Sequence, residues 1–304
     1  MGVSFQELRE RSQLPVRHNN DVAGLLYGDK FSLPITKLFV DRGWSPDIAT
    51  IGMLVTGLVG SVVLAVAPAG APMLVGAVIL LLYYVCDCVD GEVARYRGIE
   101  DMRWGYYDYL FHMLVKPCAF AGVGIGLWRQ TGGDLFLFAA FSATVAALWL
   151  KMFLDAPGIL FLRAVLAGKP GRDPSFRRFY RSLHPDLDDH TADDTDDKPP
   201  AGFPLGFNTV TIRAVMTNFD MGLLVLVLAT AGDLFVGPFE LPGIGLVSLR
   251  ALWLLWYGVI LPLDFIDYLR SYLARGHFPS ETERLLTLAH HFRAPPQDED
   301  ESTG

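Results

Sequence analysis

Long apolar segments dominate the hydrophobic pattern of this 304-residue chain, 51% of which is hydrophobic. Six such segments run over 48–67, 72–92, 106–128, 134–155, 209–231 and 245–268. Each approaches the roughly 20 residues that a helix needs to cross the hydrocarbon core of a membrane. Only a Gly-Gly turn at Gly132 and Gly133 separates the third from the fourth. The pattern predicts an all-α fold, an integral membrane bundle of six transmembrane helices.

The segment before the first span predicts an amphipathic juxtamembrane helix. Residues 26–44 place apolar side chains at helical spacing among Lys and Arg, which is typical of a helix lying on a membrane surface. A plain soluble helix is the alternative. Ser45 is expected as N-cap of the first span, with Pro46 in its first turn. The expected organisation is an N-terminal arm (1–45), a membrane domain (46–270) with a long connection inside it (156–205), and a C-terminal tail (271–304).

Ionisable residues interrupt the apolar pattern at helical spacing in two consecutive spans. Asp87 and Asp90 are three residues apart and share one helix face, whereas Asp108 and His112 are four apart and share a face of the next. Two facing helices could bring all four side chains together. An ionisable residue inside a membrane span marks a functional site by default.

Lys and Arg residues are concentrated in four regions: the arm, the turn after Arg95, the 156–205 connection and the tail. The intervening short turns carry almost none, Arg129 excepted. The positive-inside rule therefore predicts a multi-pass cell-membrane protein with both termini and the acidic motif on the cytoplasmic side. The net charge of −8 comes largely from Asp-rich runs at 186–197 and 298–301 that we interpret as solvated, and it argues against a nucleic-acid partner.

Convergent carboxylates at the end of a membrane span are suited to hard divalent cations. Mg²⁺ and Mn²⁺ prefer carboxylate oxygens and readily hold substrate phosphates. Arg95, one turn beyond Gly91, can bind a phosphate with two hydrogen bonds. Gly91 and Ala94 leave room for a ligand, or for a neighbouring helix, since small residues also serve helix packing in membranes. Cys86, Cys88 and Cys118 occupy apolar positions and are interpreted as packing residues.

The run Asp-x2-Asp-Gly-x2-Ala-Arg from Asp87 to Arg95, followed by a glycine and Asp108, resembles the signature of the CDP-alcohol phosphotransferase family. The interval from Arg95 to Asp108 fits the family's spacing. The segment Ser45-Pro46-Asp47-Ile48-Ala49-Thr50 is similar to the start of the family's first membrane helix. The resemblance covers most of residues 25–270.

The resemblance implies a six-helix membrane bundle of a kind that is often dimeric, so a homodimer is one expected form. Members transfer a phosphoalcohol group, such as phosphatidyl, from a CDP-alcohol to an acceptor hydroxyl and release CMP, in phospholipid or related phosphodiester biosynthesis. Two divalent cations, Mg²⁺ or Mn²⁺, would be held by Asp87, Asp90 and Asp108. The CDP site would comprise Asp87, Asp90, Gly91, Ala94, Arg95 and Thr50.

The sequence departs from the family pattern at two positions. Gly105 lies one residue later than the usual glycine, and His112 replaces the last acid of the motif. By resemblance that acid activates the acceptor hydroxyl. Histidine can serve as a base near neutral pH but is a poorer ligand for Mg²⁺, so His112 is expected to be the general base. Metal ligation is a lesser alternative, and a residue that only packs or hydrogen-bonds is another.

The acceptor site is expected among basic residues facing the same cavity. Lys116 follows His112 by one helical turn, while Lys151 and Arg213 lie in the fourth and fifth spans. Together they could bind an acceptor phosphate; alternatively, Lys151 and Arg213 extend to the membrane interface. The sequence leaves the acceptor open, and the donor is either CDP-diacylglycerol or a soluble CDP-alcohol.

Three other functions compete with this interpretation. A prenyltransferase would also use aspartate-rich metal sites but would release pyrophosphate. An ion-coupled transporter would show two related halves, and no inverted repeat is evident in the sequence. A non-catalytic relative would bind CDP-alcohols without turning them over.

Overall fold

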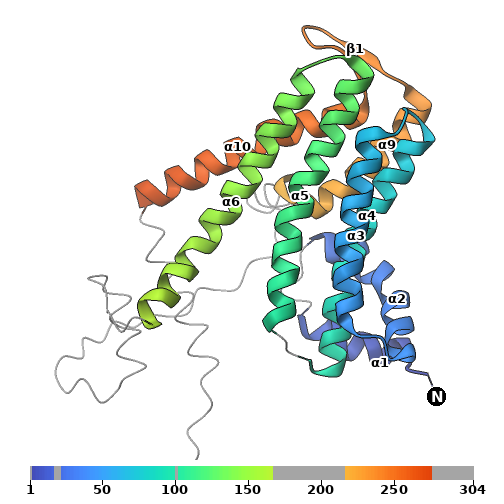
Figure 1. Ribbon diagram of the computed structural model, residues 1–304, viewed down its shortest axis with the longest axis vertical. Helices are drawn as coiled ribbons and strands as arrows, with labels where there is room; N and C mark the ends of the chain where they lie inside the picture. Colours follow the sequence, from blue (N-terminus) through green and yellow to red (C-terminus); the bar gives the residue numbers. More distant parts are fainter. Residues whose placement is uncertain (1, 17–21, 100–101, 167–215, 276–304) are drawn as a thin grey trace, which may run out of the picture. The chain divides into compact units, whose positions relative to one another are not determined.

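The computed structural model describes residues 2–16, 22–99, 102–166 and 216–275, and it is almost entirely helical (Figure 1). The N-terminal arm contains α1 (Phe5–Leu8), a π-helical turn η1 (Arg9–Gln13), a 3-10 turn η2 (Leu14–Val16), a second π-helical turn η3 (Gly24–Gly28) and α2 (Asp29–Arg42). The remaining elements are α3 (Pro46–Val66), α4 (Ala71–Arg97), α5 (Met102–Thr131), α6 (Leu135–Leu166), α9 (Phe219–Val236), β1 (Phe239–Leu241), β2 (Gly245–Val247) and α10 (Leu249–Arg275).

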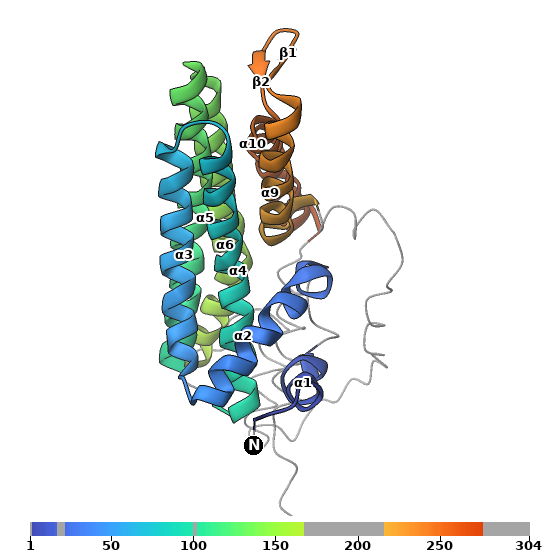
Figure 2. The same cartoon turned by 90° about the vertical axis from the view of Figure 1, so that its right-hand side faces the viewer.

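Among the described residues, six helices are long and apolar enough to cross a membrane. The spans are Pro46–Val66, Ala71–Arg97, Gly105–Thr131, Leu135–Phe153, Phe219–Val236 and Leu249–Arg270. The expected all-α, multi-pass membrane architecture is therefore confirmed. Helices α3, α4 and α5 lie side by side with the first part of α6 (Figures 1 and 2).

Local sequence explains where the first spans begin and end. The Ser45 side chain caps α3 by accepting a hydrogen bond from the Asp47 amide at 3.4 Å, and Pro46 occupies the first turn, as predicted. Two helices end at a glycine in the left-handed region: α2 ends at Gly43 (φ 70°), and α4, which carries the acidic motif, ends at Gly98 (φ 64°). Glycine adopts this conformation without a Cβ penalty, which makes these chain reversals sharp.

Glycines bring α3 and α5 into direct backbone contact. A Cβ at position 126 would lie 2.1 Å from the carbonyl oxygen of Leu64, and one at position 122 would lie 2.3 Å from that of Ser61. No side chain fits at either distance. Small residues of this kind allow membrane helices to pack closely where lipid provides little hydrophobic drive for association. The acidic face of α5 is thereby fixed against the rest of the bundle.

The predicted amphipathic helix is present as α2, but its buried face is partly polar. Ser32 and Thr36 are fully buried and Phe39 is largely buried, whereas Phe31 is 58% exposed and Leu38 is 42% exposed. The helix turns the two hydroxyl groups and Phe39 toward α4, and it turns Phe31 and Leu38 outward. This outward apolar face is the one expected to contact a membrane surface.

The last two spans differ from their predicted limits. α9 begins only at Phe219, because the Asn218 side chain caps it by accepting from the Met221 amide at 2.8 Å, and it continues to Val236 rather than ending at 231. The start of the predicted 245–268 span is instead the second strand of a hairpin. β1 pairs antiparallel with β2, Phe239 opposite Val247, and α10 begins at Leu249.

Contacts within the chain define two units. The first comprises Met1–Leu148 and Gly206–Asp264, and the second comprises Trp149–Leu205 and Phe265–Gly304. In the second unit the Trp149 and Phe265 rings lie with their centroids 5.3 Å apart. Of the predicted 156–205 connection, residues 156–166 are helical and continue α6; the rest, like most of the 271–304 tail, lies outside the described residues.

Candidate functional site

Two facing helices of the first unit bring carboxylate and imidazole groups together. Asp87 lies on α4, and Asp108 and His112 lie one turn apart on α5. One ligand atom of each lies within 4.8 Å of the others. His112 Nε2 is 3.1 Å from Asp87 Oδ1 and 3.5 Å from Asp108 Oδ1. The helical spacing in the sequence predicts this convergence.

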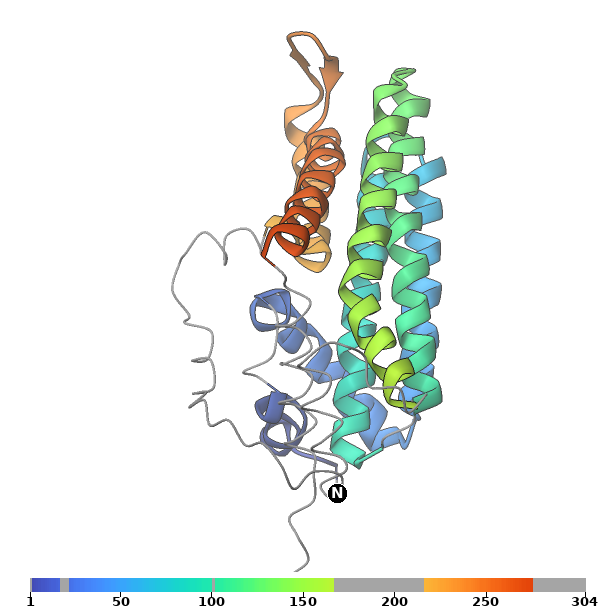
Figure 3. The same ribbon diagram turned by 90° about the vertical axis from the view of Figure 1, so that its left-hand side faces the viewer.

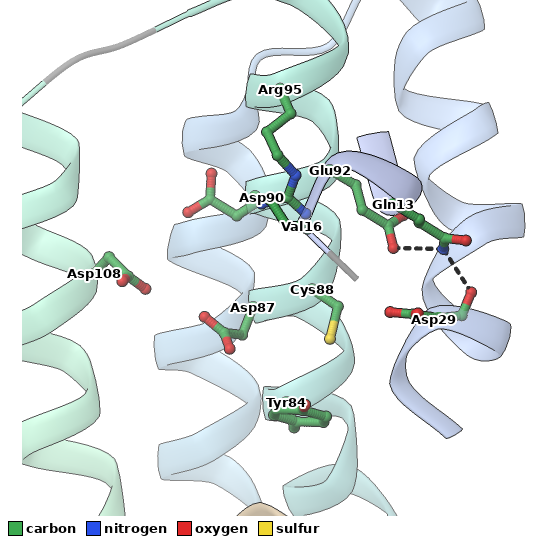
Figure 4. Close-up of a pocket in the computed structure, with 11 residues that line it drawn as sticks. Gln13, Val16, Asp29, Tyr84, Asp87, Cys88, Asp90, Glu92, Arg95 and Asp108 are labelled. Carbon is green, nitrogen blue, oxygen red and sulfur yellow. Dashed lines mark hydrogen bonds between the residues drawn. The ribbon is translucent and has the colours of Figure 1, made fainter. Parts of the chain in front are cut away.

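Asp90 points toward the same space without joining this close group. Figure 4 shows the carboxylates of Asp87 and Asp90 directed from α4 toward Asp108 on α5. Asp90 Oδ2 accepts a 2.7 Å hydrogen bond from the buried Thr50 hydroxyl on α3. Thr50 does not line the cavity, and its role is to orient the Asp90 carboxylate through this hydrogen bond. The compact group is thus Asp87, Asp108 and His112, whereas the sequence suggests the three aspartates as the metal ligands.

A cavity of about 310 Å³ opens beside these carboxylates. Its lining includes the motif residues Asp87, Asp90, Gly91 and Arg95 together with Asp108. Residues that the sequence did not indicate complete it: Gln13, Val16, Asp29, Tyr84, Cys88 and Glu92. The volume is at the lower end of the range for small-molecule sites in proteins. A carboxylate wall with a guanidinium at one end suits a ligand that carries phosphate groups and a divalent cation.

Gly91 faces a guanidinium and not a neighbouring helix. A Cβ at this position would lie 2.8 Å from Nη1 of Arg95, and the three nearest non-local atoms all belong to that side chain. Arg95 is held in this place because its Nε donates to the Ser12 carbonyl at 2.6 Å. The small size of Gly91 is therefore explained by the Arg95 position, which argues against the helix-packing alternative. Ala94 is half-buried and does not line the cavity.

The two ring nitrogens of His112 have different partners, carboxylates on one side and a tyrosine hydroxyl on the other. Its Nε2 faces the carboxylates, and its Nδ1 is hydrogen-bonded to the hydroxyl of Tyr83, which is fully buried. The rings of Tyr83 and His112 meet edge to face at 5.5 Å. A tyrosine hydroxyl can donate or accept, so Tyr83 can accompany either tautomer of the imidazole. Sequence reasoning missed Tyr83, although it lies four residues before Asp87 on the same helix face.

The donor set fits a divalent cation. Asp108 Oδ1 is buried and, apart from its 3.5 Å contact with His112 Nε2, has no hydrogen-bond partner among the described residues, which leaves a carboxylate oxygen available for a ligand. The carboxylates of Asp87 and Asp108 have ligand atoms within 4.8 Å of one another. A cation bound between them would relieve their electrostatic repulsion. Oxygens of Asp87, Asp90 and Asp108 match the preference of Mg²⁺ and Mn²⁺. The imidazole nitrogen of His112 is the less suitable ligand for Mg²⁺.

The N-terminal arm closes one side of the cavity through Glu92. This carboxylate is 1% exposed. Its Oε1 accepts from Gln13 Nε2 at 2.8 Å and from the Ser32 hydroxyl at 2.5 Å, and its Oε2 accepts from the Thr36 hydroxyl at 2.5 Å. Gln13 also donates to the main-chain oxygen of Asp29 at 2.8 Å (Figure 4). The network places arm residues against the same turns of α4 that carry the acidic motif.

The expected acceptor residues are not gathered in this cavity. Lys116 lies on α5, with its amine 5.5 Å from the centroid of the Phe219 ring, and does not line the cavity. Lys151 belongs to the second unit and forms a 3.1 Å ion pair with Asp155. Arg213 lies outside the described residues. Cys88, interpreted from the sequence as a packing residue, does line the cavity.

A scan against protein-family models finds no match, and a search of the curated proteins finds no relative. Motif spacing and site geometry therefore carry the functional argument.

Proposed function

We propose that this protein is a membrane CDP-alcohol phosphotransferase, which transfers a phosphoalcohol group to an acceptor hydroxyl and releases CMP. The observation that supports it best is the convergence of Asp87, Asp108 and His112 beside the Arg95 cavity. These residues occupy the spacing of the family signature. The substitution of His112 for an acid leaves a basic atom at the point where two carboxylates meet.

Each group of the site has a role in such a transfer. Asp87, Asp90 and Asp108 would hold Mg²⁺ or Mn²⁺, which neutralises charge on the diphosphate when bound. Arg95 and the space over Gly91 suit the nucleotide phosphate. His112 Nε2 takes the proton of the acceptor hydroxyl, whose oxygen attacks the β-phosphorus. The bond from that phosphorus to the bridging oxygen breaks, and CMP leaves with the electron pair.

In this proposal the Tyr83 hydroxyl accepts from His112 in the tautomer that can act as a base. A neutral imidazole that accepts a proton at Nε2 carries its own proton on Nδ1, and that proton is donated to the Tyr83 oxygen. The proposal also places the site and both termini at the cytoplasmic side, because the Lys and Arg residues follow the positive-inside pattern. A soluble nucleotide donor or product is available there. A homodimer is part of the same proposal, through the family resemblance.

The decisive test is CMP release by the purified full-length protein in detergent. CDP-diacylglycerol and soluble CDP-alcohols would each be combined with a panel of hydroxyl acceptors, with Mg²⁺, Mn²⁺ or a chelator. Asp108→Asn and His112→Ala would be compared with Asp134→Asn, which alters an acid that accepts from the Trp128 indole at 3.1 Å and does not line the cavity. We expect metal-dependent CMP release that both site variants lose and the control retains.

The outcomes separate the competing functions. Loss in Asp108→Asn but not in His112→Ala would retain the metal site and refute His112 as the base. Pyrophosphate release from a prenyl diphosphate would favour the prenyltransferase. Binding of CDP-alcohols without turnover by any acceptor, together with activity gained in His112→Asp, would identify a non-catalytic relative.

A further inference from the structure

A second cavity lies at the other end of the first unit, where the hairpin meets the helix ends. Its volume is about 580 Å³, and it is lined by residues of the α3–α4 turn, the end of α5, the start of α6, the end of α9 and the start of α10. Gly70 at its edge precedes Asp90 by 20 residues, almost all within α4, which corresponds to roughly 30 Å of helix. The cavity is therefore separate from the acidic site.

A buried arginine lines this cavity, and one of its three side-chain nitrogens has no hydrogen-bond partner among the described residues. The Arg250 side chain is 7% exposed; its Nη1 lies 3.3 Å from Asp233 Oδ2, and its Nη2 is hydrogen-bonded to Gln130 Oε1. Its Nε is buried and has no hydrogen-bond partner among the described residues. A buried donor without an acceptor is costly, so this N–H calls for a ligand atom.

The charge of the cavity does not oppose an anionic ligand. Asp233 also accepts from the Leu249 amide at 2.6 Å, so its carboxylate is engaged by the first turn of α10 as well as by Arg250. The positive end of the dipole of this 27-residue helix adds to the guanidinium charge. The negative charge of Asp233 is thus offset both by the Arg250 guanidinium and by the first turn of α10. The Arg250 Nε–H therefore lies in a locally positive environment.

The remaining lining combines the hydroxyl residues Thr131 and Ser248 with a larger set of apolar residues. Leu127 and Phe136 line the cavity from α5 and α6, and Ile244 and Leu246 line it from the hairpin. Ile244 is 42% exposed and Leu246 is 61% exposed, so the hairpin side is accessible. Figure 1 shows the hairpin at the end of the bundle where α5 turns into α6, and Figure 3 shows the same arrangement from another side. The volume far exceeds the roughly 30 Å³ that one water molecule occupies, so the cavity has room for part of a larger molecule.

We propose that this cavity binds a membrane phospholipid. A phosphate oxygen accepts from Arg250 Nε, and an acyl chain packs against Phe136, Leu127 and Leu246. Guanidinium groups are favoured partners of phosphate, and headgroups occur at the ends of membrane-spanning helices, where this cavity lies. The site is distinct from the proposed catalytic centre and does not depend on the activity proposed for it.

Binding is tested on the full-length protein in detergent by titration with phosphatidylglycerol and native mass spectrometry. Arg250→Lys keeps a positive charge beside Asp233 but removes the Nε donor. Its matched control is Arg129→Lys, an exposed arginine on α5 at the same end of the bundle that donates to the Ala65 carbonyl at 2.9 Å and does not line the cavity. We expect wild-type and Arg129→Lys proteins to bind equally, and Arg250→Lys to bind about ten- to a hundred-fold more weakly, the value of one hydrogen bond to a charged group.

A second pair of variants keeps the test decisive if Arg250→Lys fails to fold, as judged by size-exclusion chromatography. Ile244→Trp fills the cavity mouth, whereas Phe235→Trp enlarges a side chain that is already 88% exposed outside it. Weaker binding only in Ile244→Trp supports the site. Equal binding by Arg250→Lys and Arg129→Lys, or by both tryptophan variants, overturns it. Diacylglycerol, which lacks the phosphate, is expected to bind poorly to every variant, and binding equal to that of phosphatidylglycerol would overturn the role of the phosphate.

Discussion

Glu92 provides the sharpest test of how the N-terminal arm is held against the motif helix. Its buried carboxylate accepts hydrogen bonds from Gln13, Ser32 and Thr36 and has no ion-pair partner among the residues that the structure describes. The energetic role of this carboxylate therefore rests on hydrogen bonds alone. Glu92→Ala removes every acceptor at once and leaves a void, whereas Glu92→Gln keeps the shape and one oxygen.

The size of each effect follows from the donors that lose their acceptor. A buried donor left without a partner costs about 1–3 kcal/mol. The Ser32 and Thr36 hydroxyls can turn toward carbonyls of their own helix, which reduces the loss. We expect Glu92→Ala to lower the free energy of unfolding by about 3–5 kcal/mol. Glu92→Gln should lower it by about 1–2 kcal/mol, because a hydroxyl can rotate to accept from the new amide.

Reversible unfolding in mixed micelles, followed by circular dichroism, measures both changes. Glu240→Ala is the matched control, since Glu240 is exposed on the hairpin and should change stability by less than about 0.5 kcal/mol. A double-mutant cycle of Glu92→Gln with Thr36→Val isolates one contact, with an expected coupling of about 1 kcal/mol. The reasoning fails if Glu92→Ala costs no more than the control, or if the cycle shows no coupling.

Three further predictions concern packing, the imidazole and the arm. Gly126→Ala should lower the midpoint of thermal unfolding, because its Cβ would overlap an α3 carbonyl, while Gly105→Ala in the same helix meets nothing within 4 Å and should raise stability by up to about 1 kcal/mol. Tyr83→Phe should lower CMP release about 10- to 100-fold with an unchanged unfolding midpoint, in keeping with its role as a positioning residue; a midpoint drop that accounts for the lost activity would contradict that role. The pKa of Asp41 is lowered by its hydrogen bond to Lys37. This pair therefore stabilises the arm at pH values above the ordinary Asp pKa of about 4, and its contribution disappears as the pH falls through the lowered pKa. The rate of proteolysis of the arm, measured across this pH range, should depend less on pH in Lys37→Ala than in the wild type.

The sequence predicted the spans well where apolar runs end at strong signals. Ser45, Pro46 and the Gly132 turn define helix limits by local chemistry, and the structure has them there. The hairpin after α9 was missed because residues 245–247 are apolar and join the next apolar run without interruption. Hydrophobicity alone could not separate a short strand from the start of a helix.

The site was predicted only as far as helical spacing reaches. Asp87, Asp108 and His112 share faces that the sequence reveals. Gln13 contacts Glu92 from 79 residues away, and no periodic pattern records such a pair. Tyr83 was detectable from its spacing, but tyrosine in an apolar span is ordinarily a packing residue, so nothing singled it out. What the sequence could not predict is the layer of contacts that orients the site.

This orienting layer leads to a prediction about metal binding that needs no substrate. Asp87 and Asp108 have ligand atoms within 4.8 Å, on helices whose approach is fixed by glycine contacts with α3, so the carboxylates cannot move apart freely. Without a cation, their repulsion should destabilise the protein, and Asp108→Asn should match or exceed the wild type in thermal stability. With Mn²⁺ at about 100 times its dissociation constant, the wild type should gain about 2.7 kcal/mol, and the variant should gain much less. The stability order of the two proteins should therefore reverse on addition of the metal. Equal stabilisation of both proteins would place the cation elsewhere, whereas a variant that is less stable without metal would show that the carboxylates support the fold by themselves.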